Sequence, residues 1–321
     1  MSAKRSTFIN LNLLGLLFTF VAGLFMSSGL HAQAAEGEFS PPSLYSQPLP
    51  DRSSPGAINL PGGITFLQDI TYKNLTGYRP LKLDLYLPEN TTEPHPLVLW
   101  VHGGGFRMGD PRNDWTYGDW RLVLAELATH GYVVAGITYR FSGEAVYPAQ
   151  LEDAQDALAF LHKNAALWGI DTEKTVAWGL SAGGSLVSLL ATECDGNDCV
   201  QGVVNWFGPT DFTEKPDDTP VKLLFGCTDK PCSQESLKSG SAVKHIRSGL
   251  PPFVFMHGAE DPLVPAEQSI VMDKQLKQLG VESTLLLYPG LSHGFEGGTP
   301  EQLREILDTT FDQIDSLMSR D

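Results

Sequence analysis

Two patterns of apolar residues alternate along the chain from about residue 64 onward. Short, continuous apolar runs are typical of strands buried on both faces of a parallel sheet. Longer segments between them carry apolar residues at three- and four-residue spacing, the pattern of an amphipathic helix. Strands are expected at Ile64–Lys73, Leu81–Leu87, Leu97–His102, Val133–Tyr139, Thr175–Gly179, Gly202–Phe207, Phe253–His257 and Ser283–Tyr288. Helices are expected at Arg121–Thr129, Pro148–Ala166, Ser181–Thr192, Ala266–Leu279 and Pro300–Leu317.

This alternation predicts one α/β domain over residues 64–321, with a mostly parallel, eight-stranded sheet and helices on both faces. The first two strands are separated by the short turn Leu75-Thr76-Gly77, so we expect an antiparallel hairpin at the edge of the sheet. Residues 213–249 have weak periodicity and contain one pair of cysteines. We therefore expect a small insertion or cap there, after the sixth strand.

The N-terminal residues have the layout of a secretory signal peptide. Lys4 and Arg5 precede an apolar run from Phe8 to Met26, and Ala32-Gln33-Ala34 offers a cleavage site of small residues. Residues 1–34 are thus a predicted signal peptide. The run is also long enough for a retained membrane anchor, which is the alternative. Cleavage would leave an exported protein, periplasmic or secreted, without stable membrane association.

Residues 35–63 contain six prolines, which predicts an extended N-terminal arm and no separate domain. The whole chain has 22 Lys and Arg against 38 Asp and Glu, a formal net charge of −16. Such an excess of acidic residues argues against a nucleic acid or an anionic membrane surface as the main partner.

The four cysteines form two close pairs, Cys194 with Cys199 and Cys227 with Cys232, each with four residues between them. Three pairings are possible, and the two local disulfides are the simplest in an exported protein. A four-cysteine zinc site and free thiols are the alternatives, although this spacing is wide for a zinc ribbon.

The strongest chemical signal is the segment Gly179-Leu180-Ser181-Ala182-Gly183, a G-x-S-x-G motif between a predicted strand and a predicted helix. A nucleophilic serine needs a turn so tight that the residues two positions away lack side chains. Its hydroxyl then stands clear of the sheet, at the positive end of the helix. Ser181 is the predicted nucleophile.

A second signal, His102-Gly103-Gly104-Gly105-Phe106, ends the third predicted strand. Consecutive glycines let backbone N–H groups approach a substrate oxygen, as an oxyanion hole requires. Gly104, Gly105 and Ala182 are the predicted donors, and His102 is expected to hold the loop. A phosphate-binding loop is the alternative, but the Lys and Ser or Thr of a P-loop do not follow.

The acid and the base are expected on loops after the last two strands. Asp261, preferred over Glu260, follows the strand that ends at His257, and His293 follows the final strand. The chain order Ser…Asp…His is that of α/β-hydrolases. We expect His257 to be a packing residue.

These residues predict acyl transfer without a metal or an organic cofactor. His293 would take the proton of Ser181, the serine would attack an acyl carbonyl, and water would cleave the acyl-enzyme. Asp261 would hold the imidazole in the required tautomer.

The sequence resembles the HGGG-type esterase branch of the α/β-hydrolases, and within it the bacterial BD-FAE-like carboxylesterases, which include acetylxylan and feruloyl esterases. The resemblance runs from about Ile64 to Leu317. It is carried by His102–Phe106, Arg107–Asp110, Tyr139–Phe141, Tyr147–Leu151, Gly169–Asp171, Trp178–Gly184, Phe207–Asp211, Cys227–Cys232, His257–Pro265 and Gly290–Gly294. The additional pair Cys194–Cys199 departs from the family pattern.

The resemblance implies a serine carboxylesterase for short-chain or aryl esters, including acyl groups on plant polysaccharides. The export predicted from the N-terminal residues suits a role in processing such polymers. Trp115, Tyr117 and Trp120 could stack on a sugar or feruloyl ring, although such a cluster is more often ordinary packing. A prolyl-oligopeptidase-like serine peptidase and an arylformamidase are alternative enzymes. A non-catalytic binding protein on a hydrolase fold is the alternative of a different class.

Overall fold

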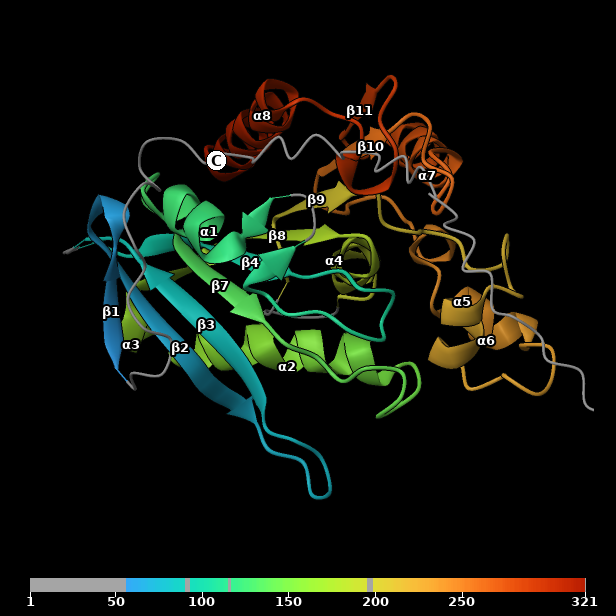
Figure 1. Ribbon diagram of the computed structural model, residues 1–321, viewed down its shortest axis with the longest axis horizontal. Coiled ribbons are helices and arrows are strands. Elements are labelled where there is room, and N and C mark those ends of the chain that lie inside the picture. Colours follow the sequence, from blue (N-terminus) through green and yellow to red (C-terminus); the bar gives the residue numbers. More distant parts are fainter. Residues whose placement is uncertain (1–55, 90–92, 115–116, 195–198, 321) are drawn as a thin grey trace, which may run out of the picture. The chain divides into compact units, whose positions relative to one another are not determined.

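The computed structural model describes residues 56–89, 93–114, 117–194 and 199–320. The predicted signal peptide and most of the proline-rich arm lie outside these residues. The main sheet has nine strands in the order β1-β2-β3-β7-β4-β8-β9-β10-β11 (Figure 1). Their bounds are β1 Ala57–Leu60, β2 Ile64–Lys73, β3 Leu81–Leu87, β4 His95–Val101, β7 Val133–Ile137, β8 Ile170–Leu180, β9 Gly202–Trp206, β10 Phe253–Gly258 and β11 Ser283–Tyr288.

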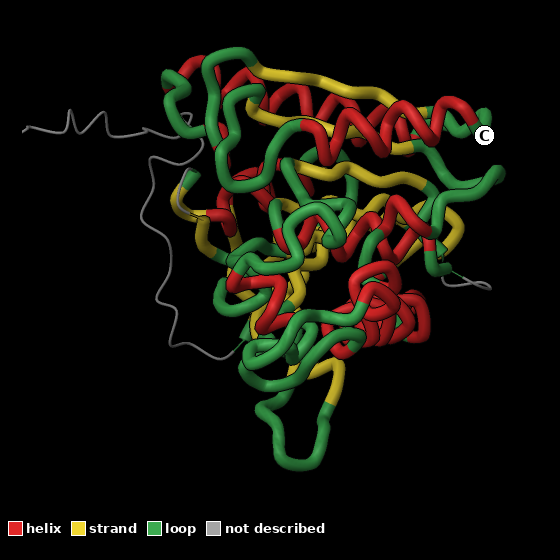
Figure 2. Tube along the Cα trace, turned by 90° about the vertical axis from the view of Figure 1, so that its right-hand side faces the viewer, coloured by secondary structure: helices red, strands yellow, loops and turns green. Residues whose placement is uncertain are grey.

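Six neighbouring strands, from β7 to β11 in spatial order, run parallel to one another, and β1, β2 and β3 extend the sheet by antiparallel pairing. The prediction of a mostly parallel α/β sheet with an edge hairpin is therefore confirmed. The loop that joins β2 to β3 projects beyond the end of the sheet, and it is seen again at the lower end of Figure 2.

The sheet has nine strands and not the eight that were predicted, because β1 was assigned to the proline-rich arm. Within β1, Ile58 and Leu60 are buried while Ala57 and Asn59 are exposed, the two-residue period of an edge strand. The segment pairs antiparallel with the first residues of β2. The four residues of β1 are too few for a two-residue period to be recognised from the sequence.

Helices cover both faces of the sheet, and each face has its own apolar core. On one face α2 (Ala149–Lys163), α4 (Ala182–Thr192) and α7 (Glu267–Gln278) pack against side chains such as Leu99 and Ala177. On the other face α1 (Trp120–Ala128) and α8 (Pro300–Met318) pack against the alternate side chains of the same strands (Figure 1). Burial on both faces explains why the central strands are continuous apolar runs.

Residues 213–249 form a helical segment between β9 and β10, where the insertion was expected. It contains α5 (Thr219–Leu224), α6 (Gln234–Ser239) and a short 3₁₀ turn. The disulfide Cys227–Cys232 closes the loop between the two helices, and Cys194–Cys199 follows α4. All four thiols are thus paired locally, an arrangement that leaves no thiolate for a zinc ion.

The remaining elements are short. They are the hairpin β5 (Asn113–Asp114) with β6 (Gly118–Asp119), the helix α3 (Ala165–Trp168) and the 3₁₀ turns η2 (Pro61–Gly63), η3 (Ala242–Lys244) and η4 (His293–Phe295). None of the helices in the described part of the chain is both long and apolar enough to cross a bilayer.

Asp84 of β3 and Arg112, on the loop between β4 and α1, form an ion pair that is closed to solvent on the Asp84 side. Two nitrogen atoms of Arg112 lie 2.5 and 2.7 Å from the two carboxylate oxygens. We predict that Asp84→Asn lowers the free energy of unfolding by about 3 kcal/mol, because the guanidinium loses its main charged partner. Asp69, 3.1 Å from Arg112, compensates in part.

Urea unfolding followed by circular dichroism measures this loss. The control is Glu282→Gln, which removes an exposed ion pair with Arg320 and should cost less than about 1 kcal/mol. Equal losses in the two variants would contradict the proposed role of burial.

Candidate active site

Ser181 occupies the turn between β8 and α4. Its backbone φ is +51°, a conformation that is rare for a residue with a side chain and that is found where a site imposes strain. A Cβ added to Gly179 would lie 2.4 Å from backbone atoms of Gly183. One added to Gly183 would lie 2.0 Å from the carbonyl oxygen of Val101. The glycines of the motif are therefore required by close backbone packing on either side of the serine.

Ser181, His293 and Asp261 form one chain of hydrogen bonds. The Nε2 atom of His293 lies 3.1 Å from Oγ of Ser181, and its Nδ1 atom lies 2.6 Å from Oδ2 of Asp261. With the ring proton on Nδ1 and donated to the carboxylate, Nε2 is free to accept the serine proton. The structure thus brings together three side chains that are 112 and 32 residues apart along the chain.

Parallel pairing of the strands brings these residues to one edge of the sheet. Ser181 follows β8, Asp261 lies on the loop after β10, and His293 begins the 3₁₀ turn after β11. The carboxyl ends of parallel strands share one edge, and β9 is the only strand between β8 and β10 in the order of the sheet.

Asp261 is held in place by four donors. Its Oδ1 atom accepts the backbone N–H groups of Leu263 and Val264, both at 2.9 Å. Its Oδ2 atom faces His293 and also Nε2 of His257, at 3.3 Å. Burial acts to raise the pKa of Asp261, but the hydrogen bonds from His257 and His293 outweigh it and hold that pKa well below its usual range. The carboxylate therefore stays ionised beside the imidazole.

His257 has a role that the sequence did not reveal. Its side chain is fully buried, its Nδ1 lies 2.7 Å from Oγ of Ser269, and its Nε2 lies 2.8 Å from the carbonyl oxygen of Val264. The ring therefore fastens the loop of Asp261 to α7 and contacts the carboxylate directly. Its position four residues before Asp261 was the available signal, but a lone histidine at a strand end carries little information.

The glycine-rich segment 102–106, called the oxyanion loop below, packs against the nucleophile turn. A Cβ added to Gly103 would lie 3.2 Å from Cβ of Ser181. Gly104 and Gly105 have φ values of +107° and +60°. Within the described residues, the N–H groups of Gly104, Gly105 and Ala182 have no hydrogen-bond acceptor. They are thus available to a ligand beside Ser181.

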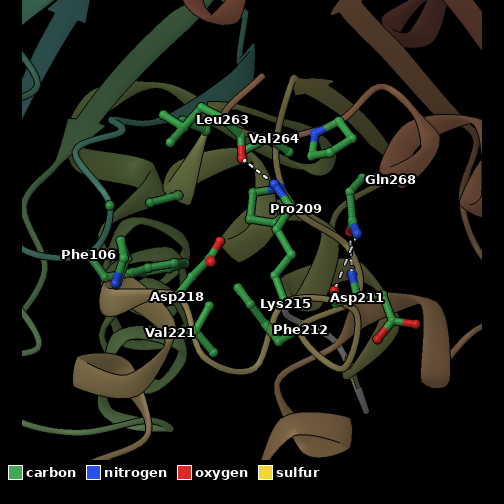
Figure 3. A pocket seen from close by; sticks show the side chains of 15 residues that line it. Phe106, Pro209, Asp211, Phe212, Lys215, Asp218, Val221, Leu263, Val264 and Gln268 are labelled. Atoms are coloured by element: carbon green, nitrogen blue, oxygen red, sulfur yellow. Dashed lines mark hydrogen bonds between the residues drawn. The ribbon is translucent and has the colours of Figure 1, made fainter. Parts of the chain in front are cut away.

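An open cleft lies beside Ser181, with about 660 Å³ of empty space when the solvent at its mouth is included (Figure 3). Its walls are mainly apolar and include Phe106 from the oxyanion loop, Val221 from α5 and Leu263 from the loop after β10. Lys215 extends into it and donates to the carbonyl oxygen of Leu263 at 3.3 Å. The segment between β9 and β10 therefore supplies one wall of the cleft.

These observations can be set beside known proteins. Residues 83–276, more than half of the chain, match the model of the family described as BD-FAE. The chain belongs to the BD-FAE family. The family assignment agrees with the esterase resemblance of the motifs around Ser181, Asp261 and His293.

This BD-FAE chain is also similar to curated proteins and, in fold, to solved structures of other proteins. It is 27% identical over 256 residues to the probable isoprenylcysteine alpha-carbonyl methylesterase ICMEL1 of Arabidopsis thaliana, covering 70% of this chain and 52% of the relative. A truncated carbohydrate esterase from gut microbiota superposes with a TM-score of 0.68 at 22% identity, covering 85% of this chain and all of that one. The bifunctional GH43-CE of Bacteroides eggerthii superposes with a TM-score of 0.66 at 27% identity, over 78% of this chain and 38% of that one. The chain spans about half the length of the curated relatives that it matches first.

Two of the three aromatic residues considered for ring stacking, Tyr117 and Trp120, are packing residues. Tyr117 and Trp120 are 4% and 1% exposed, and their rings contact each other and Trp206 inside the core. Trp115 lies outside the described residues. No group of three or more His, Cys, Asp or Glu is arranged to hold a metal ion in the part of the chain that the structure describes.

The lowered pKa of Asp261 predicts a specific pH dependence of stability. A carboxylate with a depressed pKa in the folded state contributes stability that is fully present above its unfolded value, about 3.9, and that is lost as the pH falls below it. The difference in unfolding free energy between wild type and Asp261→Asn should therefore shrink from pH 5 to pH 3.

Urea unfolding at pH 5, 4 and 3 measures this difference. Asp312→Asn, on the exposed side of α8, is the control for general effects of acid. A wild-type advantage over Asp261→Asn that stays constant across this range would contradict the assignment.

Proposed function

We propose that this protein is a serine carboxylesterase. Ser181 acts as the nucleophile, His293 as the general base, and Asp261 as the carboxylate that orients His293. The observation that carries the proposal is the continuous hydrogen-bond chain from Asp261 to Ser181, which ends beside an open apolar cleft. Membership of the BD-FAE family and the esterase names of its relatives support it.

The proposed reaction has two halves. His293 takes the proton of Ser181 while the serine oxygen bonds to the carbonyl carbon of the ester. The tetrahedral intermediate then collapses, and the departing alcohol receives that proton from His293. In the second half a water molecule gives its proton to His293 and attacks the acyl-enzyme. The acid is released as Ser181 recovers its proton.

The N–H groups of Gly104, Gly105 and Ala182 are the proposed oxyanion donors. Negative charge develops on the former carbonyl oxygen in both halves of the reaction, and fixed N–H donors stabilise it more than they stabilise the ester. Asp261, ionised and immobile, stabilises the imidazolium that forms at the same moment.

The proposed substrates are esters of short-chain or aryl acids. The cleft offers mainly apolar contact, from Phe106, Val221 and Leu263, as an acyl chain or an aromatic ring requires. Acyl groups on plant polysaccharides are a proposed natural source, in line with the family resemblance.

We also propose that the protein acts after export, with residues 64–321 as its catalytic domain and residues 213–249 as a cap beside the cleft. Two local disulfides support the assignment, because oxidising compartments favour them. The contribution of Pro220 and Val221 to the cleft supports a role for the cap in substrate selection.

Ser181→Ala tests the proposed nucleophile. Hydrolysis of p-nitrophenyl acetate or butyrate should fall by about 10⁶, the loss seen when the nucleophile of a comparable triad is removed. Circular dichroism should show an unchanged fold, and Ser316→Ala on the exposed side of α8 should keep full activity. Retained turnover in the folded Ser181→Ala protein would remove the nucleophile assignment.

A substrate panel separates the candidate functions. Wild type should hydrolyse simple esters and one or both of acetylated xylan and methyl ferulate. Preferential cleavage of a prolyl amide would indicate the peptidase, and preferential cleavage of N-formylkynurenine the formamidase. Failure on every substrate of the panel, together with failure on p-nitrophenyl esters, would favour the non-catalytic binding protein.

The position of Val221 in the wall of the cleft predicts an effect on the chain-length preference. Val221→Phe should lower kcat/KM for p-nitrophenyl hexanoate by about 10-fold relative to the acetate, because the larger ring occupies space that the longer acyl chain needs. Val271→Phe, on the exposed face of α7, is the matched control and should leave the ratio unchanged. An equal effect of Val221→Phe on both esters would show that Val221 does not line the acyl site.

A further inference from the structure

Tyr139, two residues after β7, contacts the oxyanion loop from its buried side. Its side chain is fully buried, and its ring stacks on the imidazole of His102 with the ring centres 4.6 Å apart. Its hydroxyl oxygen lies 3.1 Å from the carbonyl oxygen of His102 and 3.3 Å from that of Gly103. The hydroxyl therefore donates its single proton to two consecutive carbonyl groups of the loop.

Planarity of the peptide bond connects this contact to the proposed oxyanion donors. The carbonyl group of Gly103 and the N–H group of Gly104 belong to one trans peptide unit, so they point in opposite directions. Fixing the oxygen of Gly103 on the side of Tyr139 therefore fixes the direction of the Gly104 N–H. That N–H is one of the groups without an acceptor in the described part of the chain.

The next peptide unit is held in the same way. The carbonyl oxygen of Gly104 accepts the backbone N–H groups of Arg107 and Met108, at 3.0 and 3.2 Å. This contact fixes the direction of the Gly105 N–H. In both units the carbonyl oxygen is fixed by donors and the N–H is left free, an arrangement suited to binding an oxyanion.

External donors are needed here because the loop has little conformational preference of its own. Three consecutive glycines populate many backbone conformations, so their orientation must be imposed by neighbours. His102 supplies one restraint, with its Nδ1 atom 2.7 Å from the oxygen of Gly103. Burial lowers the pKa of His102 to about 4, so the neutral ring has a single proton to donate. Tyr139 supplies the other side-chain restraint.

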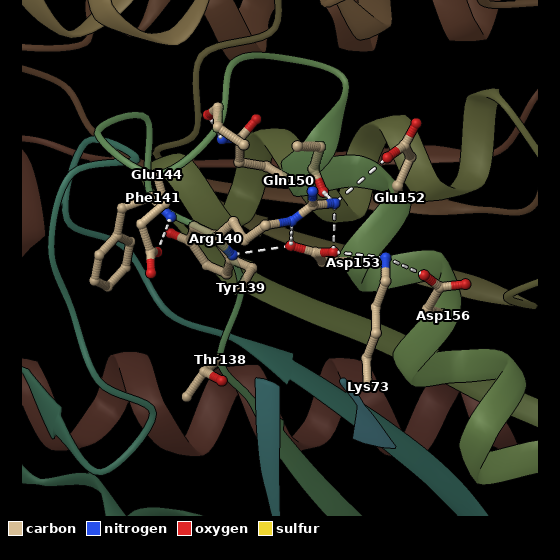
Figure 4. Close-up of polar contacts among 12 residues, drawn as sticks. Lys73, Thr138, Tyr139, Arg140, Phe141, Glu144, Gln150, Glu152, Asp153 and Asp156 are labelled. Carbon is tan, nitrogen blue, oxygen red and sulfur yellow. Dashed lines mark hydrogen bonds and ion pairs between the residues drawn. The ribbon is translucent and has the colours of Figure 1, made fainter. Parts of the chain in front are cut away.

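The position of Tyr139 is itself rigidly determined (Figure 4). The next residue, Arg140, makes two side-chain hydrogen bonds of 2.8 Å to the fully buried Asp153, which Lys73 contacts at 2.9 Å. Arg79 donates to the carbonyl oxygen of Tyr139 at 2.8 Å. These contacts connect Tyr139 to β2 and α2, so its hydroxyl acts from a fixed point in the fold. Burial also raises the pKa of Tyr139, which keeps that hydroxyl protonated.

We propose that Tyr139 is a positioning residue for the oxyanion donors, whose hydroxyl orients the Gly103–Gly104 peptide so that the Gly104 N–H faces the reacting carbonyl oxygen. The inference rests on the proposed esterase function. It assigns a catalytic consequence to a buried tyrosine that touches neither the substrate nor the three residues of the triad.

Tyr139→Phe tests the proposal by removing only the hydroxyl. We expect kcat for p-nitrophenyl acetate to fall by about 10- to 100-fold with KM nearly unchanged, because a misdirected donor weakens binding of the transition state more than binding of the ester. The pH dependence of kcat/KM should keep its midpoint, because His293 and Asp261 are untouched.

Tyr72→Phe is the matched control. Tyr72 is also buried, and its hydroxyl also donates to a backbone carbonyl, that of Thr138 at 2.6 Å, away from the oxyanion loop. The Tyr72→Phe variant should lose a comparable amount of thermal stability, because it also loses one buried hydrogen bond. Its kcat should stay within about twofold of wild type.

An aryl trifluoromethyl ketone gives a second readout that a purely structural role would not change. Ser181 adds to the ketone carbon, its proton passes to His293, and the carbonyl oxygen becomes an oxyanion with no leaving group. The inhibition constant should rise in Tyr139→Phe by about the factor that kcat/KM falls, as expected for a transition-state analogue. It should stay constant in Tyr72→Phe.

The outcomes separate the two proposals. If wild type hydrolyses esters and Tyr139→Phe matches Tyr72→Phe in kcat and in ketone affinity, the positioning role is overturned and the esterase proposal stands. If wild type neither hydrolyses esters nor binds the ketone, both fail.

If Tyr139→Phe does not fold, 4-aminophenylalanine at position 139 is the second variant, because its amino group replaces the hydroxyl as a hydrogen-bond donor. A folded protein with kcat near wild type then supports the proposal, and a folded protein with kcat reduced 10-fold contradicts it.

Discussion

The hydrogen bond between His293 and Asp261, 2.6 Å long and shielded from solvent on the carboxylate side, is the contact on which the chemistry of this site depends. It directs one nitrogen of the imidazole to the carboxylate and leaves the other to accept the proton of Ser181. The carboxylate can do this only while it stays ionised in a buried position. Hydrogen bonds from His257, from His293 and from two backbone N–H groups keep it ionised, although burial acts to raise its pKa.

The sheet brings the parts of the site together with little contribution from local structure. Five parallel pairings fix the register from β7 through β11, and the loops at their carboxyl ends bring Ser181, His293 and Asp261 within hydrogen-bonding distance. The oxyanion loop differs, because glycine-rich backbone has no preferred path. Its course is imposed from outside, by the ring of His102, by Tyr139 and by its own downstream N–H groups. Rigid strands and a restrained loop thus meet at Ser181.

The cleft beside Ser181 is shaped in part by a segment that lies outside the hydrogen-bond chain. One wall of the cleft comes from the helical segment between β9 and β10, which contributes no side chain to the hydrogen bonds that join Asp261, His293 and Ser181. The disulfide Cys227–Cys232 lies in the same segment, directly after α5. Substitutions in this segment can therefore alter the space available to an acyl group while the hydrogen bonds among Asp261, His293 and Ser181 stay intact.

The sequence by itself determined the class of fold and the chemically informative residues, because both leave local patterns. Buried parallel strands are continuous apolar runs, and a tight turn around Ser181 requires glycines at two fixed positions, which a reader of the chain can recognise. Ala57–Leu60 escaped recognition because four residues show too little of a two-residue period. Tyr117 and Trp120 could not be assigned to the core or to the cleft, because aromatic residues occur in both and the sequence around them does not distinguish the two.

Only the tertiary structure decided which side chains act on one another. The contact of His257 with Asp261 and the contact of Tyr139 with Gly103 join residues whose spacing along the chain matches no motif. A hydrogen bond depends on distance and direction in space, and these are set by the packing of strands and loops that are remote in sequence. The residue types of the site could therefore be read from the sequence, whereas the restraints that orient them required the fold.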